Sequence, residues 1–94
     1  MESLALTATH TLREMLARQP LTPAKVAFAW KVAAGPALAR AAAAAWTTDG
    51  TLRLTVGDPA WKPEVERAAP IVQDRLAFLL GRGVVRGIVV AVTR

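Results

Sequence analysis

The sequence contains no cysteine, and it has only one histidine among its 94 residues. Without cysteine, neither disulfide bonds nor thiolate-bound zinc can form. The lone His10 has no partner ligands near it in the sequence, so no metal and no cofactor are expected. Glu64 and Glu66 project in different directions from a predicted helix, and no phosphate-binding loop is present. The sequence therefore predicts a protein that is not an enzyme.

Long apolar runs are also missing. No segment holds about 20 uninterrupted apolar residues, because Gly35, Pro36 and Arg40 interrupt the alanine-rich run 32–46. The N-terminus lacks the basic stretch followed by an apolar stretch that a secretory signal requires. Together with the absence of cysteine, these features predict a cytoplasmic protein with no membrane partner.

Acidic residues are scarce relative to basic ones. Seven Asp and Glu stand against twelve Lys and Arg, which gives a formal net charge of +5. A positive charge favours polyanionic partners, although it says nothing about the fold. The length predicts a single domain, residues 1–94. Much of the 53% hydrophobic content is alanine, so the core must depend on a few larger apolar side chains.

The strongest structural signal is a β-hairpin around Asp49 and Gly50. This dipeptide favours a two-residue type I′ turn, because both central positions of that turn need a positive φ. In the strand that follows, 51–56, apolar and polar side chains alternate. With the apolar side chains facing inward, the expected register places Trp46 beside Arg53 on the open face of the sheet. There the two side chains either contact nucleic acid or form a cation–π pair that only stabilises the hairpin.

Helical periodicity flanks the hairpin on both sides. Pro70 lies inside the last helical segment and is expected to kink or split it, because proline lacks a backbone N–H. Pairing within the hairpin is expected to make the alanine run end as a strand, although alanine favours helix. The last helix is expected to begin at an Asp58 N-cap followed by Pro59. The sequence predicts helices over 1–19, 22–34 and 58–80, a helical turn over 36–40, and strands over 43–48, 51–56 and 84–92.

These elements predict an α+β domain with helices packed on one face of a small three-stranded sheet. In the final strand, Ile88, Val90 and Val92 share one face, and Val89 and Ala91 share the other. Both faces are apolar, which indicates that the strand is covered on both sides. One candidate cover is a second copy of the chain, which would form a homodimer.

Several short blocks occur in a distinctive order along the chain. They are Trp30 with 32–35, residues 49–56, Ala60-Trp61 with Glu64-Val65, Leu76 with 79–81, and 84–85 with 88–90. In this order and spacing, which spans residues 20–94, they resemble the DciA family of bacterial proteins. The resemblance implies a KH-like fold and a DNA-replication accessory role, in which the protein binds DNA and helps to load the replicative DNA helicase. No Gly-x-x-Gly loop is present, so a KH-type clamp on the nucleic-acid backbone is not expected.

The resemblance and the positive charge together name candidate contact residues. Trp61 matches a family tryptophan at the start of the long helix, and it is either a partner contact or part of the core. The alternative function is a small dimerising interaction domain that does not bind nucleic acid. The DNA candidates are Trp46, Arg53, Lys62 and Arg86, and the candidates for a protein partner are Trp61, Val89 and Ala91.

Overall fold

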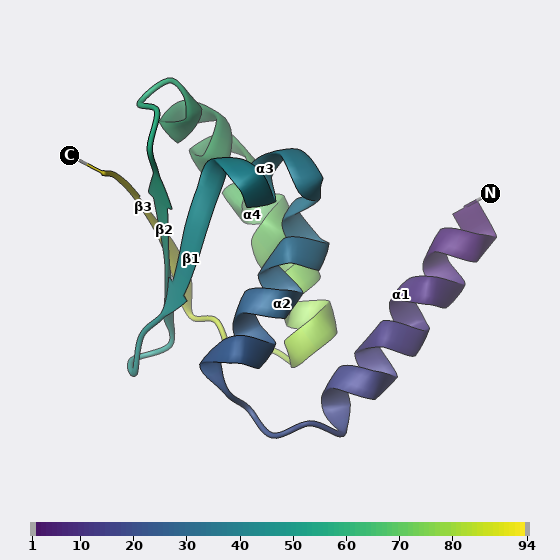
Figure 1. Ribbon diagram of the computed structural model, residues 1–94. Helices are drawn as coiled ribbons and strands as arrows, with labels where there is room; N and C mark the ends of the chain where they lie inside the picture. The colour runs from purple at the N-terminus through teal and green to yellow at the C-terminus, as the bar shows by residue number, and fades with distance from the viewer. Residues whose placement is uncertain (1, 94) are drawn as a thin grey trace.

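Three strands and four helices make up the part of the chain that the computed structural model describes, which is residues 2–93, with side chains for 10–93. Figure 1 shows their arrangement, with the N-terminal part of α1 projecting away from the other elements. In chain order the elements are α1 (Glu2–Ala17), α2 (Pro23–Ala34), α3 (Pro36–Ala41), β1 (Ala42–Trp46), β2 (Thr51–Val56), α4 (Trp61–Leu80) and β3 (Gly87–Val92).

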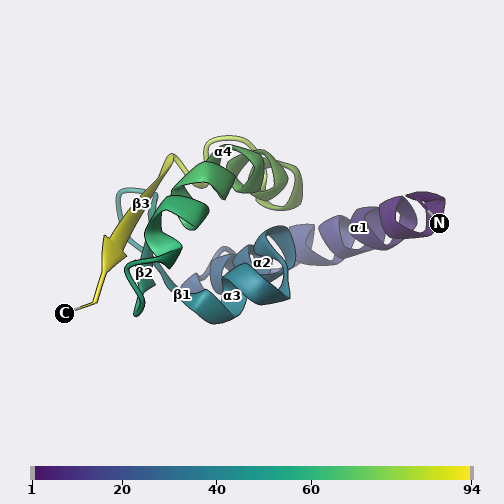
Figure 2. The same ribbon diagram turned by 90° about the horizontal axis from the view of Figure 1, so that it is seen from above.

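The strands form one mixed sheet in the order β1-β2-β3. The strand β2 pairs antiparallel with β1 and parallel with β3, and α4 is the connection that makes the parallel pairing possible. The helices lie on one side of this sheet, as the view from above shows (Figure 2). The prediction of an α+β domain with helices on one face of a three-stranded sheet is therefore confirmed.

The core lies between the sheet and the helices α2 and α4. Leu52 and Leu54 of β2 have no exposed surface, and Trp30 of α2 is only 2% exposed. Leu76 of α4 is equally well buried. The core therefore joins the apolar face of the second hairpin strand to the apolar faces of α2 and α4, as predicted. The buried apolar residues are Leu16, Val26, Ala29, Trp30, Ala33, Ala42, Leu52, Leu54, Val56, Val65, Val72, Leu76, Leu79 and Val85.

The predicted hairpin register is wrong by one residue. Trp46 pairs with Leu52, and Arg53 instead faces Ala45. The loop has three residues, because the backbone N–H of Thr47 donates to the carbonyl oxygen of Thr51 (2.9 Å). Within this loop, only Gly50 takes a positive φ, of 89°, whereas a type I′ turn would need two such residues. Since a one-residue shift moves a side chain to the other face, Trp46 faces the helices, and it packs against the core.

The alanine run divides as predicted, into the short helix α3 and the strand β1. Gly35 ends α2 with a φ of 84°, and Pro36 begins α3 directly after it. The strand then starts at Ala42, one residue earlier than expected, and Ala42 is buried against the helices. Pairing with β2 thus outweighs the helix propensity of alanine, because it satisfies the backbone groups of β1.

The helix α4 is continuous through Pro70, so the predicted alternative of a split helix is wrong. Pro70 lies on the exposed side of α4, where its ring meets solvent. The helix also begins later than predicted, at Trp61. Asp58 acts before the helix, since its carboxylate accepts from the N–H of Ala60 (2.9 Å) and shapes the preceding turn.

The strand β3 is shorter than predicted and begins at Gly87. The residues before it form the approach from α4, in which the side-chain amide of Gln73 donates to the carbonyl oxygen of Val85 (3.2 Å). Within β3 the predicted faces are confirmed by the register. Val90 pairs with the buried Leu54, and Val89 pairs with the exposed Arg53.

Candidate nucleic-acid and partner surfaces

A hollow of about 430 Å³ lies at the hairpin end of the molecule, between the β1–β2 loop and the loop that leads into β3. It brings together two of the predicted DNA contacts, Trp46 and Arg86. Trp46 ends the outer strand β1, and Arg86 directly precedes the other outer strand, β3. We call it the hairpin hollow. Its lining residues are Leu21, Trp46, Thr48, Asp49, Gly50, Arg82, Gly83, Val84 and Arg86.

Arg86 is held against the hairpin loop by its backbone and by its aliphatic stem. Its backbone N–H donates to the carbonyl oxygen of Gly50 (2.8 Å). A Cβ added at Gly50 would stand 3.1 Å from Cγ of Arg86, which is closer than ordinary van der Waals contact. The absence of a side chain at Gly50 therefore gives room for the Arg86 stem, and the guanidinium is left at the exposed rim of the hollow.

Trp46 forms an apolar wall of the same hollow. The indole is half-buried and packs against the hydrophobic core. Its Nε1 is shielded from solvent and has no hydrogen-bond acceptor among the described residues. A buried indole N–H without an acceptor is uncommon, because leaving such a donor unpaired costs free energy.

Arg82 joins the hairpin hollow to a second hollow of about 650 Å³ beside α1. The second hollow contains Arg13, whose guanidinium carbon lies 4.8 Å from the ring centre of Phe78 in a cation–π contact. His10 meets the same ring edge-on, at 5.2 Å between ring centres. Arg13, Arg82 and Arg86 thus follow one another across two adjoining hollows, and we call these three residues the basic track.

Two carboxylates lie beside the basic track and reduce its charge. Asp74 borders the second hollow, and Asp49 borders the hairpin hollow. The hydroxyl of Thr47 and then the backbone N–H of Thr51 donate to Asp49, and these bonds hold its pKa below its ordinary value. Because the bonds favour the ionised carboxylate, their contribution to hairpin stability is present above the ordinary pKa and is lost as the pH falls through the lowered pKa.

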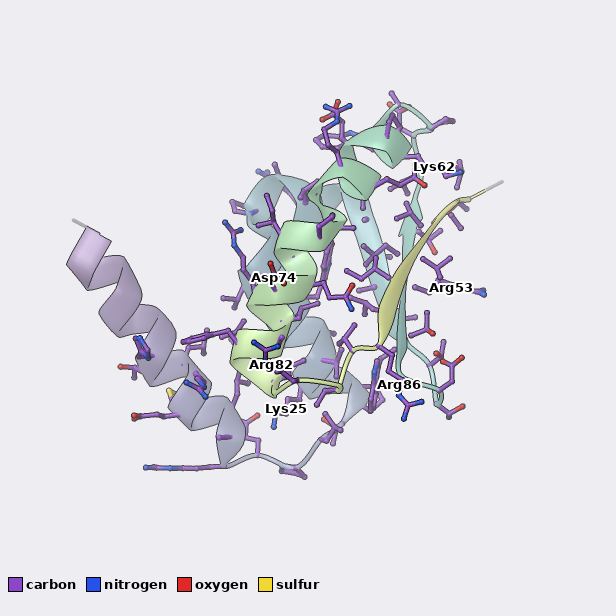
Figure 3. The ribbon with its side chains drawn as sticks, turned by 180° about the vertical axis from the view of Figure 1, so that it is seen from behind. Lys25, Arg53, Lys62, Asp74, Arg82 and Arg86 are labelled. Carbon is purple, nitrogen blue, oxygen red and sulfur yellow. The ribbon has the colours of Figure 1, made fainter. Side chains whose placement is uncertain are left out.

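Arg53 lies apart from the basic track, on the uncovered face of the sheet. Figure 3 shows it extending from β2 away from the helices. Since Trp46 faces the helices, the predicted pairing of Trp46 with Arg53 is wrong, both as a joint nucleic-acid contact and as a cation–π brace. We call this side the open sheet face, and its described residues from the strands are Ala43, Ala45, Thr51, Arg53, Thr55, Gly87, Val89 and Ala91.

The open sheet face is mostly apolar. Val89 is 48% exposed there, and Ala91, two residues further along β3, lies on the same face. Among the described strand residues of this face, only Arg53 is charged. A face of small apolar side chains around one cation is suited to an apolar partner that offers a carboxylate.

Lys62 and Trp61 lie at the start of α4, far from the basic track. Figure 3 shows Lys62 at the opposite end of the molecule from Arg82 and Arg86. Trp61 packs partly against the core and also lines a shallow hollow of about 340 Å³ with Arg40. The structure therefore separates the four predicted DNA contacts into one group of two, Trp46 and Arg86, and two isolated cations.

Arg13, Arg82 and Phe78 were missed by reasoning from the sequence alone. Arg82 stands between Gly81 and Gly83, a pattern that had been interpreted only as the stop of α4. Both glycines take positive φ values, so this loop turns sharply and exposes the arginine. An arginine flanked by glycines in a basic protein was the one available signal, whereas the position of Arg13 depends on how α1 packs on α4.

Substituting Gly50 should test whether the hairpin loop positions Arg86. We expect Gly50→Ala to lower the free energy of unfolding by about 1–3 kcal/mol, because alanine resists a positive φ and its Cβ would press on Arg86. Gly57→Ala is the matched control, since a Cβ at Gly57 meets nothing within 4 Å and its φ is ordinary. Urea unfolding of both variants measures the difference, and equal midpoints would contradict this account of the loop.

The described residues contain no group of three or more histidine and acidic side chains that could hold a metal ion. No helix in the same part of the chain combines the length and the apolar character needed to cross a bilayer.

Comparison with known proteins identifies a family. The family described as "Dna[CI] antecedent, DciA" matches residues 4–90, which is nearly the whole chain. No curated protein and no solved structure matches the chain. The element order is compatible with a KH-like fold, and the α+β class is given by the structure itself.

Proposed function

This chain belongs to the DciA family of accessory proteins of the replicative DNA helicase, and we propose that it helps to load or operate that helicase by contacting both the helicase and DNA. The family match over residues 4–90 is the observation that carries the proposal. The two exposed surfaces described above offer one site for each contact, because one is rich in arginine and the other is mostly apolar.

We assign DNA contact to the basic track. Arg13, Arg82 and Arg86 come from three different segments, and Arg82 borders both hollows. Guanidinium groups bind phosphate oxygens well, and contacts to phosphate carry no sequence information. DNA binding through this surface is therefore expected to be sequence-independent and to weaken as salt concentration rises.

We assign helicase contact to the open sheet face. Val89 supplies exposed apolar area, and Arg53 supplies the single charge, so a partner segment with apolar residues around one carboxylate would be complementary. Trp61 is a second candidate for partner contact, because its half-exposed indole lies at the other end of α4.

A pull-down against the replicative helicase of the same organism tests the proposal. We expect the wild-type chain to be retained and Val89→Glu to be lost, because a carboxylate would interrupt the apolar face. Ile71→Glu is the control, since Ile71 is 57% exposed on α4 and outside this face. Retention of neither the wild-type chain nor the control would contradict the helicase role. Equal retention of all three would move the contact away from the open sheet face.

The exposed apolar face of β3 favours a second candidate function, a dimerising interaction domain that does not bind DNA. In that case two copies would cover each other's open sheet faces. Light scattering at high protein concentration distinguishes this candidate, because it predicts twice the monomer mass for the wild-type chain and the monomer mass for Val89→Glu. A monomer mass for both would exclude it.

A further inference from the structure

The hairpin hollow has two properties that a surface for phosphates alone does not need. It has apolar walls, formed by the indole of Trp46 and the side chain of Leu21, and it offers an open volume of about 430 Å³. Ligand pockets in proteins usually measure roughly 300–1,000 Å³. The hollow is therefore of a size to take a flat organic group as well as the phosphate at its rim.

Trp46 provides the second observation, because its Nε1 is shielded from solvent and has no acceptor among the described residues. In the hairpin loop, Thr47, Asp49 and Thr51 bond to one another. The one unsatisfied donor near the hollow thus belongs to a residue that lines it. Because Nε1 itself is out of reach, the part of the indole that a ligand in the hollow can meet is its carbon surface, which suits a flat aromatic group.

The arginines restrict the ligand further. Arg82 and Arg86 stand at the hollow, and Arg82 continues the track into the second hollow toward Arg13. Asp49 repels phosphate from the hairpin side, so an anionic group is expected on the side of the two arginines. This arrangement fits a chain of phosphates that passes the hollow and has one flat group turned into it.

From these observations we propose that the hairpin hollow takes one unstacked base of single-stranded DNA, with the base against Trp46 and the flanking phosphates on Arg82 and Arg86. The inference rests on the proposed DNA contact and adds the strandedness and the site. A duplex keeps its bases stacked and paired, so it can offer only phosphates to the basic track. The chain is therefore expected to prefer single strands over duplex of the same length.

Oligonucleotides that differ only in their bases test the proposal. The probes are an oligothymidylate of about ten nucleotides, the same backbone with abasic residues throughout, a duplex of equal length, and the corresponding oligouridylate RNA. We expect the thymidylate to bind five- to a hundred-fold more tightly than the abasic strand, which is the usual effect of one base stacked on an aromatic side chain. We also expect it to bind more tightly than the duplex.

Two variants of Trp46 connect this preference to the hollow. Trp46→Ala should remove the difference between thymidylate and abasic strands, and Phe28→Ala, at an exposed position of α2 outside both hollows, should retain it. Trp46→Phe keeps an aromatic wall, so it is the control for a loss of folding in Trp46→Ala. It also identifies the indole N–H resonance of Trp46, which should shift when thymidylate is added and should not shift with the abasic strand.

The possible outcomes separate the inference from the proposed function. Equal binding of thymidylate and abasic strands, or of single strand and duplex, would overturn the base-binding hollow and leave the phosphate contact standing. Tighter binding of the RNA would overturn the assignment to DNA. Binding of none of the four probes at low salt would overturn the DNA contact itself, and the hollow with it.

Discussion

Replacing Trp30 with alanine is expected to remove a large part of the free energy of unfolding. Trp30 is 2% exposed and projects from α2 into the core, where the sheet and α4 meet. Truncating a buried tryptophan costs about 3–5 kcal/mol, because apolar contact is lost and a cavity remains. Domains of this size are stable by about 5–15 kcal/mol in total. Much of this core is alanine and valine, so few neighbours can move in to fill the space.

Urea unfolding followed by far-ultraviolet circular dichroism measures this loss without relying on tryptophan fluorescence. Phe28→Ala is the matched control, because Phe28 lies on the same helix and is 48% exposed. We expect the control to lose less than about 1 kcal/mol, as is usual for surface positions. If the two variants unfolded at the same urea concentration, the core would not be centred on Trp30.

The face of each strand could be predicted from the sequence only where the strand has its own alternation. In β2, the apolar Leu52, Leu54 and Val56 alternate with Arg53 and Thr55. Its buried face was therefore predicted correctly. The partner strand is alanine up to Trp46 and has no alternation of its own. Its register therefore depended entirely on the turn, and a three-residue loop in place of a two-residue loop reversed the face of Trp46.

The candidate site was harder to predict because its parts are distant in the sequence. Arg86 was a DNA candidate from charge and family resemblance, and it lines the same hollow as Trp46, although the register that suggested Trp46 was wrong. Arg13 and Arg82 come together only because α1 packs on α4 near Phe78. No spacing rule within either segment indicates that contact, so it required the tertiary structure.

Removing the charges of the basic track is expected to have the largest effect on DNA binding. We consider the triple variant in which Arg13, Arg82 and Arg86 become glutamine. Each arginine that contacts a phosphate adds about one unit to the slope of log affinity against log salt. The slope should therefore fall by about three units, and the affinity at low salt should fall on the order of a hundredfold. Glutamine keeps much of the side-chain length, so the fold should be retained.

A second triple variant separates contact from net charge. Lys31, Arg40 and Arg67 lie on other exposed parts of α2, α3 and α4, and their replacement by glutamine also lowers the net charge from +5 to +2, by the same three units. We expect this variant to keep its salt slope and to lose little affinity, because none of its three residues lines either hollow. Fluorescence anisotropy with a labelled oligonucleotide over a salt series measures both variants. If the two triple variants lost affinity and slope equally, the DNA contact would be a property of overall charge, and the basic track would not be the site.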